Sequence, residues 1–167
     1  SGFRLGGRFR ACALLCFILS SGLLRSASGA ILRVKQYTTP PSFPNGASWS
    51  TAYPSLDAAL AVASTNDQIW VASTVGVGMY TPTGNQTGGD GNTRHFEIAI
   101  NVVIRGGYPT NPSNGTTARD VATNVTAFSG DFDGDDPAFG TSPADPDFLN
   151  NAYRVFEVVD VSDSCVI

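Results

Sequence analysis

Four aspartates fall within six positions of the stretch TAFSGDFDGDD: Asp131, Asp133, Asp135 and Asp136. Proteins hold Ca²⁺ with several carboxylate or carbonyl oxygens on a short turn, and a glycine allows that turn to bend. The first three aspartates stand at alternate positions, with Gly134 between two of them. The spacing in this chain differs from that of an EF-hand loop, since the glycine comes too early and no glutamate follows at the required distance. Two hypotheses stay open: a Ca²⁺ site formed by these aspartates or, as we favour, a charged Asp-Gly turn in solvent.

Two further side chains could do chemistry, the single histidine His95 and Arg105. A zinc site would need cysteine or a second histidine near His95. A general base would need an orienting carboxylate and an activated nucleophile, and no motif for them is visible. Arg105 could act as a base on an acidic sugar only if it faced the same groove as the aspartates. We expect His95 to be a surface residue and Arg105 to be a solvated or salt-bridged residue, and we assign no catalytic and no cofactor-binding residue.

Three asparagines begin Asn-x-Thr sequons: Asn85, Asn114 and Asn124. Sequons matter in a eukaryotic secretory pathway. Asn85 and Asn114 lie in polar stretches of low complexity, residues 84–93 and 109–120, that we expect to be solvent-facing loops. We interpret the three sequons as chance matches in a chain rich in asparagine and threonine.

The first thirty residues have the pattern of a secretory signal. Three arginines within the first ten residues precede an apolar run over residues 11–19, and small residues follow at 26–30. The apolar run is too short for a membrane-spanning helix, so a signal peptide over residues 1–30, cut after Ala30, is predicted. An uncleaved anchor is the alternative. Residues 31–167 would then form one secreted or cell-surface domain, extracellular and not membrane-spanning.

Removing residues 1–30 takes four of the ten basic residues and none of the fourteen acidic ones, which leaves a net charge of −8. Such a surface repels nucleic acid and anionic lipid at long range, so nucleic acid is excluded as a partner. Cys165 is the one cysteine left, so no internal disulfide is possible and its pairing stays open. We expect a monomer. Since the sequence lacks an initial methionine and ends within an apolar run, we expect function to lie partly beyond Ile167.

Five segments rich in valine, isoleucine, phenylalanine and threonine are predicted to be strands: residues 31–38, 68–73, 96–108, 124–130 and 153–162. One helix is predicted over residues 55–64, with Ser55 as its N-cap. From Ile69 onward the strand centres are 33, 23 and 30 residues apart, and no second helix separates them. This spacing is typical of a solenoid with one coil per repeat, and a β-sandwich with long loops is the alternative.

Taken together, these segments resemble a family of bacterial secreted proteins. The resemblance is carried by NGASW (45–49), by the helix leading into QIWVA (68–72), and by RGGY (105–108) ahead of SGD (129–131). It resembles the N-terminal cap and opening coils of right-handed parallel β-helix surface proteins of pectate-lyase-like type, and covers residues 31–162. The implied fold is all-β: a truncated parallel β-helix whose open end is covered by the short helix, with Trp49 and Tyr53 packed beside it.

The function implied by the resemblance is broad, because such proteins include polysaccharide lyases, hydrolases, adhesins and surface proteins without known activity. Our first expectation is a non-catalytic role in adhesion or glycan contact, with an extracellular polysaccharide or a host cell surface as partner. The alternative is a Ca²⁺-dependent pectate-type lyase whose catalytic coils lie beyond residue 167. Ca²⁺ is the one cofactor considered.

Overall fold

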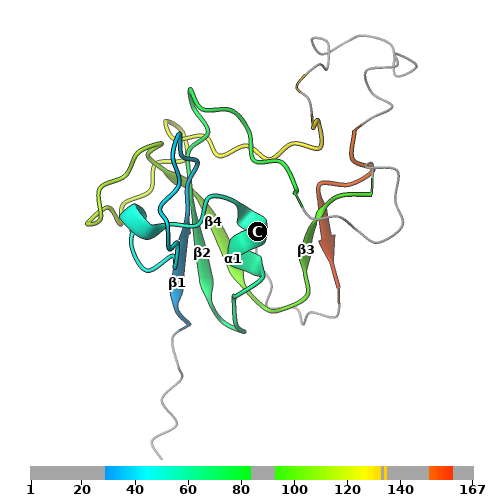
Figure 1. Cartoon of the computed structure of the whole chain (residues 1–167), viewed down its shortest axis with the longest axis horizontal. Helices are drawn as coiled ribbons and strands as arrows, with labels where there is room; N and C mark the ends of the chain where they lie inside the picture. Colours follow the sequence, from blue (N-terminus) through cyan, green and yellow to red (C-terminus); the bar gives the residue numbers. More distant parts are fainter. Residues whose placement is uncertain (1–28, 84–92, 133, 135–150, 160–167) are drawn as a thin grey trace, which may run out of the picture.

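The computed structural model describes residues 29–83, 93–132, 134 and 151–159 (Figure 1). Its elements, in chain order, are β1 (Ile31–Val34), the 3-10 helix η1 (Trp49–Thr51), α1 (Leu56–Leu60), β2 (Gln68–Ala72), β3 (Phe96–Ile98), β4 (Val103–Tyr108) and β5 (Phe156–Val158). They form two small parallel sheets, one with the strand order β1-β2-β4 and one that pairs β3 with β5.

The three-stranded sheet has β2 at its centre, between two parallel neighbours. Ile69, Trp70, Val71 and Ala72 of this strand are all buried. A parallel strand that is covered on both faces reads as a continuous apolar run, which explains why QIWVA is recognisable in the sequence. The predicted strand over 68–73 is therefore confirmed.

One face of this sheet packs into the main hydrophobic core, together with α1 and the strand pair β3–β5 (Figure 1). Ser55 caps α1 by accepting a hydrogen bond from the amide of Ala58 at 3.2 Å. Leu56 and Ala59 of the helix are fully buried. The predicted helix is thus confirmed in place and cap, although α1 ends at Leu60 rather than at residue 64.

The opposite face of the sheet carries a second, aromatic cluster built on Trp49, Trp70 and Tyr108. The rings of Trp70 and Tyr108 are stacked, with centroids 4.8 Å apart. Gly107, at a φ of 90°, lies where the register of β4 shifts against β2, and this bulge sets Tyr108 opposite Ala72. Trp49 was expected beside the capping helix, but it lies in this second cluster and donates from Nε1 to the carbonyl of Thr116 at 3.0 Å.

The prediction of an all-β, right-handed parallel β-helix is wrong. Within the described residues, five short strands form two small parallel sheets beside a helix, a mixed α/β arrangement without a solenoid or a closed sheet. The predicted strand 96–108 divides into β3 and β4, which belong to different sheets. Segment 124–130 contributes one isolated bridge, between Phe128 and Tyr80, in place of the predicted strand.

The division of 96–108 follows from two backbone bonds of the turn between the strands. The carbonyl of Asn101 accepts from the amide of Asn66 at 2.7 Å, and the amide of Val103 donates to the carbonyl of Asp67 at 3.0 Å. These bonds dock the turn onto the loop before β2, so the chain changes sheets here. Repeated apolar segments along the sequence therefore do not all stack in one sheet.

Most of the residues at the two ends of the chain lie outside the described part. Apart from residues 29 and 30, the predicted signal lies outside the described residues, and so does Cys165. No helix in the described part is both long enough and apolar enough to span a membrane. The strand predicted over 153–162 is confirmed in its centre as β5, which pairs with β3.

Candidate functional site

A groove of about 650 Å³ lies where the chain leaves the three parallel strands of the larger sheet. Its walls come from the segments after β1, β2 and β4 and from the loop before α1, with the lining residues Lys35, Gln36, Tyr37, Thr38, Pro54, Val77, Thr110 and Asn111. In open α/β sheets, ligands bind in the crevice outside the carboxyl ends of the strands, because loops from several strands meet there. The groove occupies this position.

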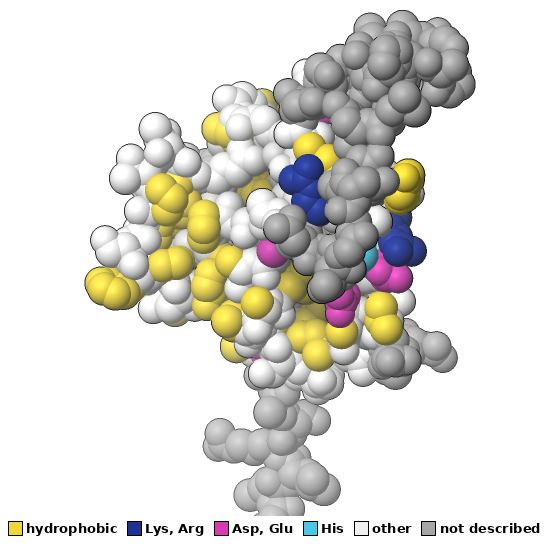
Figure 2. All heavy atoms as spheres, turned by 45° about the vertical axis from the view of Figure 1, so that its right-hand side comes forward, with side chains coloured by type: hydrophobic (Ala, Val, Ile, Leu, Met, Phe, Trp, Pro, Cys, Tyr) yellow, Lys and Arg dark blue, Asp and Glu magenta, His cyan; other side chains and the backbone are white. Residues whose placement is uncertain are grey.

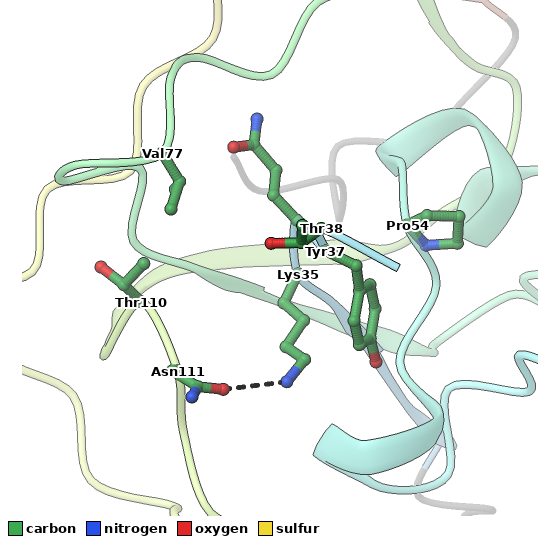
Figure 3. A pocket seen from close by; sticks show the side chains of 8 residues that line it. Lys35, Tyr37, Thr38, Pro54, Val77, Thr110 and Asn111 are labelled. Atoms are coloured by element: carbon green, nitrogen blue, oxygen red, sulfur yellow. Dashed lines mark hydrogen bonds between the residues drawn. The ribbon is translucent and has the colours of Figure 1, made fainter. Parts of the chain in front are cut away.

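Among the described residues that line the groove, Lys35 is the one with a charged side chain. Its Nζ donates to Oδ1 of Asn111 at 3.0 Å and lies 4.6 Å from the centre of the Tyr37 ring (Figure 3). Partial burial lowers the pKa of Lys35 from its ordinary value of 10.5. An ammonium, an amide and an aromatic ring thus converge within one hollow.

Tyr37 is fixed in this arrangement by its hydroxyl, which donates to the carbonyl of Trp49 at 3.0 Å. Burial raises the pKa of Tyr37, and a hydrogen bond with the backbone of Ala52 acts in the opposite direction. Since the hydroxyl is occupied on the protein side, the ring is the part of Tyr37 left to contact a ligand. A ring held in this way loses little conformational entropy when a ligand covers it.

The wall opposite is the loop after β2, tied down at both of its ends. Gln36 Nε2 donates to the carbonyl of Met79 at 2.9 Å, and Thr110 Oγ1 donates to the carbonyl of Val75 at 3.1 Å. Between these ties, Val77 faces the groove with about half of its surface exposed. The groove therefore has an apolar side at Val77 and a polar side at Lys35 and Asn111.

His95 lies elsewhere, directly before β3, and it is 3% exposed. Its Nδ1 faces the carbonyl of Thr93 at 2.8 Å, and its Nε2 lies 2.6 Å from Oε2 of Glu157. Figure 2 shows this side of the molecule, where little of the cyan histidine reaches the surface beside the magenta carboxylates. The sequence prediction of a surface histidine is wrong.

Both ring nitrogens of His95 face oxygens of the protein, the carbonyl of Thr93 on one side and the carboxylate of Glu157 on the other. A second hollow, of about 380 Å³, adjoins His95 and is also lined by Asp57 and Glu97. Asp57 is held by the amide and hydroxyl of Thr83, at 3.1 and 2.9 Å. We therefore read His95 as a structural tie between β3 and β5 rather than as a general base.

Of the predicted calcium ligands, Asp131 is described, whereas Asp133, Asp135 and Asp136 lie outside the described residues. Asp131 Oδ1 accepts from the amide of Gly134 at 2.6 Å, which makes a turn of the expected kind. Among the described residues, no three acidic, histidine or cysteine side chains are grouped to hold a metal ion. The Ca²⁺ site stays a prediction, and calorimetric titration with millimolar Ca²⁺ tests it, since an absence of binding would reject it.

The sequon asparagines also have structural roles where they are described. Asn114 donates from Nδ2 to the hydroxyl of Ser50 at 3.2 Å and accepts from the amide of Ser50 at 2.8 Å. Asn124 donates from Nδ2 to the carbonyl of Gly107 at 3.3 Å. Asn85 lies outside the described residues. A glycan would be attached at Nδ2, the atom that makes the contacts with Ser50 and Gly107, and the reading of the sequons as chance matches stays a prediction.

No protein-family model, no curated protein and no solved structure matches this chain. The residues that line the groove therefore carry the functional argument by themselves. None of them was singled out from the sequence, because Lys35 and Asn111 meet only through the pairing of distant strands. The one available signal was the spacing of Lys35 and Tyr37, two residues apart at the end of a predicted strand, which places both on one face.

Proposed function

We propose that this chain is a non-catalytic glycan-contact protein, secreted or displayed at the cell surface. The groove at the carboxyl ends of β1, β2 and β4 would bind a short stretch of polysaccharide. The observation that carries this proposal is the convergence of Lys35, Tyr37 and Asn111 in that groove.

The chemistry of the lining supports a sugar as the ligand. Sugar rings present an apolar face and a rim of hydroxyl groups, so they need a flat apolar surface beside hydrogen-bonding groups. The Tyr37 ring supplies the flat surface, and the Asn111 amide and the Lys35 ammonium supply polar partners. Thr38 and Thr110 add hydroxyls that can both donate and accept. An open groove also suits a polymer better than a small, enclosed metabolite.

The test is calorimetric titration of the native chain with neutral and acidic oligosaccharides. We expect Tyr37→Leu and Asn111→Ala each to weaken binding about tenfold, because each removes one wall contact of the groove. Phe43→Leu is the matched control for the aromatic change, since Phe43 is 86% exposed and lies outside the groove. Absence of binding by the native chain, or equal losses in Tyr37→Leu and Phe43→Leu, would reject the groove as a glycan site.

A further inference from the structure

Three arginines gather around the hydroxyl end of Tyr108, although the chain is acidic overall. Arg33, Arg105 and Arg119 each act on this hydroxyl electrostatically. Burial raises the pKa of Tyr108, while Arg119, Arg105 and Arg33, in that order, act to lower it. Three cationic side chains thus lie near Tyr108, in a protein with a formal net charge of −4.

The strand register explains how two of these arginines come together. Arg33 of β1, Trp70 of β2 and Arg105 of β4 lie opposite one another on adjacent parallel strands. Residues in register on parallel strands point to the same face of the sheet. The guanidinium of Arg33 lies 5.3 Å from the centre of the Trp70 ring, which confirms its direction. Arg33 and Arg105 thus flank one indole.

Arg119 reaches the same place from the loop after β4. Its Nε donates to the carbonyl of Gly106 at 2.7 Å. This bond holds the guanidinium of Arg119 at the residue that follows Arg105. The carboxylate of the neighbouring Asp120 accepts hydrogen bonds from the amides of Ala122 and Thr123, at 3.1 and 3.2 Å. It is therefore directed at its own turn and not at Arg119.

None of the three arginines forms an ion pair with another described residue, since the ion pairs of the described part involve His95, Arg154 and Glu157. One guanidinium nitrogen of Arg33 donates to the carbonyls of Ala47 and Gly46, at 2.6 and 3.4 Å. The outer nitrogens of Arg105 and Arg119 have no such partner among the described side chains. Guanidinium groups bind carboxylate and sulfate through paired hydrogen bonds, and unpaired ones on a shared surface form a site for such anions.

This site adjoins the groove. Arg33 and Lys35 lie two residues apart on and after β1, and Asn111 follows Tyr108 by three residues after β4. We propose that Arg105 and Arg119, supported by Arg33, form an anion-binding site that selects sulfated or carboxylated glycans over neutral ones, which rests on the proposed glycan function of the groove. Nucleic acid, the other common polyanion, is disfavoured because the net negative charge of the chain repels a long phosphate backbone.

The experiment titrates the native chain with a sulfated oligosaccharide, its desulfated counterpart, inorganic sulfate and a single-stranded oligonucleotide of equal charge. We expect the sulfated sugar to bind about tenfold more tightly than the desulfated one at low salt, and the difference to shrink at 500 mM NaCl, about where screening reduces exposed charge contacts. Arg105→Gln and Arg119→Gln should each remove most of this preference and leave the affinity for the desulfated sugar unchanged. Arg154→Gln is the matched control, since it removes the same charge at β5.

The outcomes separate this site from the groove. Equal binding of both sugars, or a preference that survives both arginine changes, would overturn the anion site and leave the glycan function standing. Sulfate binding that Arg105→Gln abolishes, without binding of either sugar, would support the anion site and reject the glycan function. Tighter binding of the oligonucleotide than of the sulfated sugar would overturn the assignment to glycans.

Discussion

The backbone amide of Ala30 donates a hydrogen bond to Oδ1 of Asp67 at 2.6 Å, and Asp67 is 7% exposed. The second oxygen of this carboxylate, Oδ2, accepts from the amide of Ser64 at 2.8 Å. The carbonyl of Ala30 in turn accepts from the amide of Gln68 at 2.8 Å. One buried side chain thus fastens the entry of β1 to the turn that leads into β2.

Asp67→Asn should lower the free energy of unfolding by about 1–3 kcal/mol, because the new amide group turns an N–H toward a backbone N–H and leaves one donor unpaired. Urea denaturation of the two chains measures the difference. Glu97→Gln is the control, since Glu97 is an exposed carboxylate on β3. A change at Asp67 no larger than that at Glu97 would contradict the role assigned to this carboxylate.

The same contacts bear on how a secretory signal would be removed. A cut after Ala30, as the sequence predicts, would delete both backbone bonds of that residue. A cut before Ala30 would instead set a new α-ammonium group against the Asp67 carboxylate, where opposite charges attract. We expect the processed chain to retain Ala30. The intact mass of the secreted protein decides this, and a stable chain that begins at Ile31 would refute it.

Elements whose signals are local could be predicted from the sequence. β2 is covered on both faces, so its residues form one apolar run that needs no knowledge of its neighbours. α1 begins at Ser55 because the hydroxyl of this residue satisfies an amide three positions on. No glycine or proline directly follows the helical pattern, so the end of α1 has no local signal.

Features that depend on contacts between distant segments could not be predicted. The division of 96–108 rests on bonds to Asn66 and Asp67, which no local pattern signals. The groove needs Lys35 and Asn111, 76 residues apart, to meet. His95 is buried, and its partner Glu157 comes from β5, about sixty residues further along the chain. In each case the partner lies in a segment far away in the sequence, and no local pattern identifies it.

The contact between His95 and Glu157 should be energetically coupled, because it joins a buried ring to a partly buried carboxylate across β3 and β5. A double-mutant cycle with His95→Gln and Glu157→Gln measures this coupling, which we expect at about 1–3 kcal/mol. The pair of Arg154 with the same glutamate is 3.4 Å long and Arg154 is 55% exposed. Its cycle should give less than about 1 kcal/mol. Equal couplings in the two cycles would contradict a structural tie at His95.

The carboxyl group of Asp120 should make the stability of the fold depend on pH. The Thr123 hydroxyl, then the amides of Thr123 and Ala122, hold the pKa of this exposed carboxyl below its ordinary value of 3.8, against a small opposing effect of desolvation. A carboxyl whose pKa is lower in the folded chain than in the unfolded chain stabilises the fold above the unfolded value. That contribution is lost as the pH falls through the folded value.

The Asp120→Asn variant should therefore have a lower melting temperature than the native protein at pH 7. The difference in melting temperature should narrow as the pH falls below about 4, where the carboxyl of the unfolded chain takes up its proton. The turn that Asp120 closes also holds the chain to β4, because the amide of Asp120 donates to the carbonyl of Gly107 at 2.8 Å. Thr123→Val is the companion variant, since it removes the hydroxyl and keeps the amide. It should reproduce part of the difference at pH 7. A difference that stays constant from pH 7 to pH 3 would show that the substitution acts through packing and not through the carboxylate.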